Sequence, residues 1–187
     1  MTKQSEEAQK ETTNFGISND LQASTVPTIL PPQPLLDSNG KEIAGKYNFP
    51  VVNLIRVYTE KFTTKKEEEK MRLCFHFKEV GSKREYTERL MEFDINKKDS
   101  KGQSFLEVFN RKIKHIYEQL ISFPKEGIGK NATSITDYFE KIAVAFNTGR
   151  EGKPIFTDKD GNFKNCWLKL LYYKQFVQIP YSPNFIE

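Results

Sequence analysis

Apolar and polar residues alternate with a period of two over much of residues 49–95. The stretch "FPVVNLIRVYTEKFT" (49–63) predicts a strand, because β-branched and aromatic residues are interleaved with polar ones. "MRLCFHFKEV" (71–80) predicts a second strand, and we assign one of its faces to the core: Met71, Leu73, Phe75 and Phe77. "YTERLMEFDI" (86–95) is expected to pair back as a hairpin, with an apolar face formed by Met91, Phe93 and Ile95.

The spacing then changes to that of helices. Ser104 with Glu107, and Ser134 with Asp137, predict two helix starts of the capping-box type. Apolar residues follow each start at helical spacing: Phe105, Phe109, Ile113, Ile116 and Leu120, then Ile135, Phe139, Ile142 and Phe146. A basic rim is expected beside the first stripe, formed by Arg111, Lys112 and Lys114.

Strand-like alternation returns near the C-terminus. "DKDGN" (158–162) predicts a turn between two strands, and residues 165–179 alternate as one long strand with aromatic side chains on both faces. Antiparallel strands with two helices between them predict a β-rich α+β domain, or a small barrel with a helical insertion.

Composition divides the chain at residue 44. Residues 1–44 hold one aromatic residue, Phe15, three lysines against six acids, and four prolines between positions 27 and 34. We predict a flexible, acidic, Pro-rich arm over 1–44 and one domain over 45–187. The whole chain has a net charge of +4, so the domain carries +7, which suits either a polyanion ligand or solubility alone.

No set of residues points to catalysis. The histidines His76 and His115 have no partner at zinc-ligand spacing, and no nucleophile signature surrounds Cys74 or Cys166. We therefore predict a protein that is not an enzyme and has no metal site or cofactor. A polar N-terminus and the lack of a long apolar run predict no membrane association, an intracellular location and free thiols.

Aromatic and basic side chains interleave in a manner typical of single-stranded nucleic-acid binding. Cations neutralise phosphates, and flat rings stack on unpaired bases. We expect Arg56, Arg72, Lys78, Lys169 and Lys174 to contact phosphates. The candidate stacking planes are Tyr58, Trp167, Tyr172 and Tyr173. Burial of these rings in the core is an equally open interpretation.

The features "AFNTG", "W-L-K-L-x-Y" and the closing "P-Y-S-P-N-F-I-E" resemble the C-terminal part of single-stranded DNA-binding proteins of tailed, crAss-like bacteriophages. The resemblance covers about the last 55 residues, and it implies an OB-fold, an antiparallel barrel whose strands hold oligonucleotides. It also implies a place in DNA replication or recombination and in the host cytoplasm. Many such proteins end in an acidic tail that recruits replication proteins, whereas here the acidic segment is N-terminal.

Two hypotheses follow. The first is a protein that binds and protects single-stranded DNA with little sequence preference; RNA as the ligand and self-association stay open. The alternative is a phage virion or assembly protein whose N-terminal arm contacts neighbouring subunits.

Overall fold

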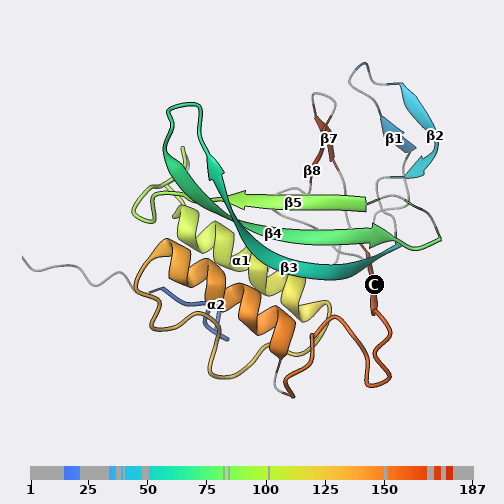
Figure 1. The fold of residues 1–187 in the computed structure, drawn as a ribbon. Coiled ribbons are helices and arrows are strands. Elements are labelled where there is room, and N and C mark those ends of the chain that lie inside the picture. The colour runs from blue at the N-terminus through green and yellow to red at the C-terminus, as the bar shows by residue number, and fades with distance from the viewer. Residues whose placement is uncertain are drawn as a thin grey trace, which may run out of the picture.

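Four antiparallel strands form the main sheet in the order β5–β4–β3–β6 (Figure 1). They are β3 (Val51–Thr63), β4 (Glu69–Glu79), β5 (Glu85–Met91) and β6 (Asn165–Trp167). The computed structural model describes residues 15–21, 34–36, 39, 41–47, 51–81, 83, 85–100, 102–149, 151–167, 171–173 and 176–178. Two helices, α1 (Phe105–Glu118) and α2 (Ile135–Thr148), lie between β5 and β6 in the chain and together below the sheet in Figure 1.

The sheet is a half-barrel, and with its two inserted helices it forms a small β-rich α+β domain of OB-like type. The predicted fold class is therefore confirmed. Two further pairs of short strands are separate from the main sheet. They are β1 (Pro34–Leu36) with β2 (Glu42–Tyr47), and β7 (Leu171–Tyr173) with β8 (Phe176–Gln178).

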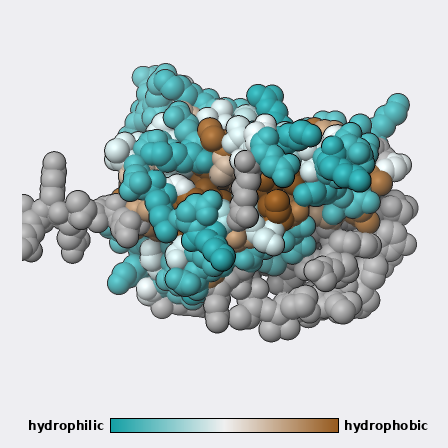
Figure 2. Space-filling model, turned by 90° about the horizontal axis from the view of Figure 1, so that it is seen from below, coloured by the Kyte–Doolittle hydropathy of each residue, from teal (hydrophilic) through white to brown (hydrophobic). Residues whose placement is uncertain are grey.

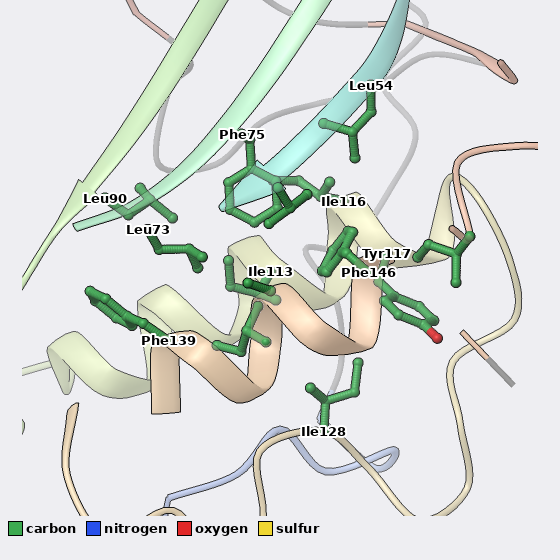
Figure 3. Close-up of a cluster of buried hydrophobic side chains, with 14 of the residues drawn as sticks. Leu54, Leu73, Phe75, Leu90, Ile113, Ile116, Tyr117, Ile128, Phe139 and Phe146 are labelled. Atoms are coloured by element: carbon green, nitrogen blue, oxygen red, sulfur yellow. The ribbon is translucent and has the colours of Figure 1, made fainter. Parts of the chain in front are cut away.

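The core lies between the sheet and the helices (Figure 3). Side chains from β3, β4 and β5 point toward α1 and α2, as labelled for Leu54, Leu73, Phe75 and Leu90. Aromatic rings pack between the sheet and the helices. The Phe75 ring of β4 contacts the Phe146 ring of α2 edge-on, with ring centroids 5.2 Å apart. The predicted core face of β4 is confirmed, since Leu73, Phe75 and Phe77 are fully buried and Met71 is 9% exposed.

The predicted inward face of β5 was wrong. Leu90 pairs with Leu73 and is buried, whereas Met91 is 45% exposed. The strand ends at Met91, so the period of two does not extend to Phe93 and Ile95, which pack on the core from the following segment. Glu88 then occupies an inward position of the strand, opposite Phe75.

Glu88 is inward because it meets a cation from α1. The Lys112 ammonium contacts the Glu88 carboxylate, and the Lys112 side chain has no exposed surface. Lys114 is also buried, and its ammonium donates to the carbonyls of Asn19 and Leu21 at 2.6 and 2.5 Å. The exposed basic rim expected on α1 is therefore wrong, because Lys112 and Lys114 are buried and their ammonium groups bind buried acceptors.

Both helices begin where they were predicted, but only one of them is capped as expected. The Ser134 hydroxyl accepts the Asp137 amide at 3.1 Å, and the Asp137 carboxylate accepts the Thr133 amide at 2.7 Å. Ser104 also precedes its helix, but its side chain makes no capping hydrogen bond.

Residues 15–21 belong to the domain, although the sequence placed them in the arm. Phe15 and Ile17 are buried in the core, and Ile17 exchanges two backbone hydrogen bonds with Ile128 at 2.8 and 3.1 Å. The Asn110 amide donates to the Gly16 carbonyl at 3.2 Å. Two apolar residues in a polar stretch give almost no periodic signal, which explains the wrong assignment. Residues 34–36 and 42–44 of the predicted flexible arm also lie in strands, β1 and β2, which pair with each other. For the positions outside the described residues, the arm stays a prediction.

The single long strand expected over 165–179 is also wrong. Residues 165–167 form β6, which pairs with Val51–Asn53 of β3. Residues 171–173 instead pair with 176–178, with Tyr172 opposite Val177. A short hairpin therefore follows β6, and alternation along 165–179 does not define two continuous faces.

Candidate nucleic-acid interface

The face of the sheet that points away from the helices is polar and rich in cations. The pairing of β3 with β4 decides which side chains are neighbours on this face. Arg56 lies opposite His76, Tyr58 opposite Cys74, and Glu60 opposite Arg72. The register shifts between Leu54 and Arg56, so the alternation restarts at a bulge. We call this surface the outer face. On this face, β3, β4 and β5 carry two carboxylates, Glu60 and Glu85. They also carry five cationic side chains: Arg56, Lys70, Arg72, Lys78 and Arg89.

The Glu60 carboxylate contacts three other side chains of the outer face. One oxygen, Oε1, accepts from Arg72 Nε at 2.6 Å, lies 3.5 Å from Arg89 Nε, and accepts from the Cys74 thiol at 3.1 Å. The hydrogen bond from Cys74 lowers the pKa of Glu60, and Arg72 and Arg89 lower it further. The carboxylate therefore stays ionised and holds two guanidinium groups side by side.

Two rings on β3 are stacked with guanidinium groups. The Arg56 guanidinium carbon lies 4.4 Å from the Tyr58 ring centre, and that of Arg72 lies 5.1 Å from the Phe62 ring centre. Burial raises the pKa of Tyr58, and the neighbouring Cys74 and Glu60 raise it further, so its phenol stays neutral. In each pair a planar guanidinium group lies over an aromatic ring, so both pairs place flat groups on the outer face.

The two free thiols of the sheet are buried, and His76 on the outer face is hydrogen-bonded. Burial raises the pKa of Cys74 to about 12, and burial does the same for Cys166, so both free thiols stay protonated. His76 is held by Thr87 Oγ1 at 2.8 Å and by Glu85 Oε2 at 3.1 Å. In the part of the chain that the structure describes, no group of three or more metal-ligating side chains occurs.

The structure brings together four of the nine predicted site residues. Arg56 and Lys78 are exposed on the outer face, and Tyr58 and Arg72 are partly exposed there. Trp167 lies in β6 opposite Val51, and Tyr172 and Tyr173 lie in β7 of a different sheet. Lys169 and Lys174 lie outside the described residues, and their proposed phosphate contacts stay predictions.

Three further residues on the outer face were missed. Glu60, Phe62 and Arg89 complete the cluster around Arg72. The signal for Arg89 was present, since alternation from Leu90 places it outward once Leu90 is known to face the core. Glu60 and Phe62 are two and four residues after Tyr58 on β3, so the same alternation places them on its face.

The helix side of the molecule combines a mostly hydrophilic surface with an apolar region (Figure 2). Figure 2 views the molecule from below Figure 1, and most of the visible coloured surface is hydrophilic, with apolar residues gathered across the middle. Among the described residues, no helix combines the length and apolar character that crossing a bilayer takes. The paired arginines and rings described above lie on the opposite side, on the outer face of the sheet.

No protein-family model, no curated protein and no solved structure matches this chain. The resemblance to phage single-stranded DNA-binding proteins therefore stays a prediction. Support for a function comes from the side chains of the outer face.

Proposed function

We propose that this protein binds single-stranded DNA across the outer face of the sheet, with little sequence preference and without catalysis. The observation that supports this most is the cluster of Arg56, Arg72, Lys78 and Arg89 beside the rings of Tyr58 and Phe62. Cations that neutralise phosphates release condensed counterions, and rings accept any base, because every base has a π-face. The protein would protect exposed strands during phage DNA replication or recombination in the host cytoplasm.

The dimensions of the outer face suit an extended strand. Lys78 and Arg72 lie six residues apart on β4, which corresponds to ~20 Å along the strand. Arg56 and Arg89 flank this row on β3 and β5. A cationic row of this length can follow several successive phosphates, as in other OB-type surfaces.

The test replaces the two exposed cations that lie outside the Glu60 cluster. Arg56→Gln with Lys78→Gln should weaken binding of a 15-nucleotide oligothymidylate about tenfold or more at low salt, and should reduce the salt slope by about two. Fluorescence anisotropy measures both quantities. The matched control is Lys65→Gln with Lys66→Gln, which removes the same charge from the exposed β3–β4 turn. Equal losses in the two variants, or no binding by the wild type, would contradict the proposal.

The alternative, a virion or assembly component with an N-terminal arm, stays a prediction. Residues 15–21, which the arm was expected to include, pack within the same domain.

A further inference from the structure

An open groove of about 650 Å³ lies where β6 joins β3, next to the turn after β4. Its lining includes Asn53, Ile55, Lys78, Val80, Lys83 and Phe163. Lys78 belongs both to this groove and to the outer face, so the two surfaces are continuous. The volume is within the ~300–1,000 Å³ range of small-ligand sites.

Phe163 is the notable side chain of the groove. The residue is 46% exposed, although its ring stacks on the buried ring of Phe156, with centroids 6.3 Å apart and an interplanar angle of 14°. A ring supported on one side and open to solvent on the other has a fixed orientation. This is the arrangement that a stacking platform for a flat ligand needs.

The backbone around Phe163 is also fixed. The Asp158 carboxylate accepts the amides of Asp160 and Asn162, each at 2.9 Å, and closes the preceding turn. The Asn53 side-chain amide donates to the Lys164 carbonyl at 3.0 Å and to Asn165 Oδ1 at 2.9 Å. These bonds attach the loop to β3, so ligand binding would cost little ordering of the loop.

Two exposed ammonium groups complete the groove. Lys78 and Lys83 line it. Glu79 is the one carboxylate among the described residues of the lining, and it accepts the Tyr86 hydroxyl at 2.8 Å. An exposed ring next to two cations is complementary to a base that carries a phosphate.

We propose that this groove holds one unpaired nucleotide of the bound DNA strand, with its base stacked on Phe163 and its phosphate at Lys78 and Lys83. The inference rests on the proposed function, because it treats the groove as the end of the same strand-binding surface. It assigns to Phe163 a role that none of the predicted site residues covers.

The test separates stacking from phosphate contact. Phe163→Leu should weaken binding of the 15-nucleotide oligothymidylate about tenfold, and should leave binding of an abasic backbone of the same length unchanged. Phe163→Tyr, which keeps the ring, should bind both strands like the wild type. Lys78→Gln should weaken both strands and reduce the salt slope by about one.

A direct readout is ultraviolet cross-linking of the same oligothymidylate, followed by trypsin and mass spectrometry. Cleavage after Lys159 and Lys164 releases residues 160–164, in which Phe163 is the only aromatic residue. An adduct on this peptide supports the inference. Wild-type binding with no such adduct and no effect of Phe163→Leu overturns the inference alone, whereas no wild-type binding overturns the proposed function as well.

Discussion

A charged cluster lies on each face of the sheet, and the two clusters are built differently. On the inner side, Lys112 and Glu88 are sealed between α1 and β5, with side chains 0% and 13% exposed. On the outer face, Arg72, Glu60 and Arg89 are 25%, 31% and 47% exposed. On the inner side a buried cation contacts a nearly buried carboxylate, whereas on the outer face one carboxylate is shared by two cations.

This difference separates a structural pair from a binding surface. Burial lowers the pKa of Lys112, and the charge of Glu88 opposes that effect, so each ion depends on the other. The outer guanidinium groups keep solvent contact, and one carboxylate does not neutralise both of them. The outer face therefore offers a polyanion positive charge in excess of its carboxylates, whereas the inner pair offers none. We expect mutations on the two faces to affect different properties.

The largest expected effect is on the inner side. Lys112→Ala removes the cation that contacts the buried Glu88 carboxylate, and should lower the free energy of unfolding by about 3–5 kcal/mol. Urea denaturation followed by circular dichroism measures this change. The control replaces both ions, as Lys112→Met with Glu88→Met, and should recover most of the loss. A double variant as unstable as Lys112→Ala would show that packing, and not charge, is responsible.

A smaller effect on the helix side depends on pH. Burial lowers the pKa of His115 on α1 to about 4, below its ordinary value of about 6.5. The unfolded chain therefore takes up the proton first, and stability should fall as the pH drops from about 6.5 to about 4. After allowance for partial solvent exposure, we expect a loss of about 1 kcal/mol between pH 7 and pH 5.

Urea titrations of the wild type and of His115→Gln at several pH values test this expectation. The variant should lose the dependence between pH 7 and pH 5. Glu60, Asp137 and Asp158 have lowered pKa values, so their contribution is lost only at lower pH. An unchanged slope in the variant would assign the effect to another group.

The smallest effect on stability is expected on the outer face. Glu60→Gln should change the free energy of unfolding by less than about 1 kcal/mol, because the ion pairs it removes are partly exposed. It should tighten oligothymidylate binding about threefold at low salt, since Arg72 and Arg89 lose a competing anion. Glu69→Gln removes an equally charged but more exposed residue, whose partner Lys61 lies 3.4 Å away, and should have little effect on binding. Weaker binding by Glu60→Gln would mean that the carboxylate is needed to align the arginines.

The sequence predicted the parts of the fold in which period and burial agree. Leu73, Phe75 and Phe77 alternate and are all in the core, and Ser134 caps its helix as expected. The errors at β5 and at Lys112 have a single cause. A buried ion pair puts a charged residue at two inward positions, one on a strand and one on a helix, and a pattern of apolar residues cannot reveal either partner alone.

The candidate site was predicted to a similar extent. Arg56, Tyr58, Arg72 and Lys78 share a face because strand alternation, which the sequence shows, decides it. Phe163 was missed because its exposure depends on the turn at 158–162 and on the ring of Phe156 behind it. These contacts join residues whose spacing follows neither a strand nor a helix.

The short N-terminal stretch determines where the chain can be cut. A protein shortened to begin at residue 22 would lack Phe15 and Ile17, and Ile128 would lose its backbone partner. Lys114, which is 5% exposed, would lose the two backbone carbonyls, of Asn19 and Leu21, to which its ammonium donates. Deletions meant to remove an arm should therefore stop before Phe15, since longer ones would measure folding.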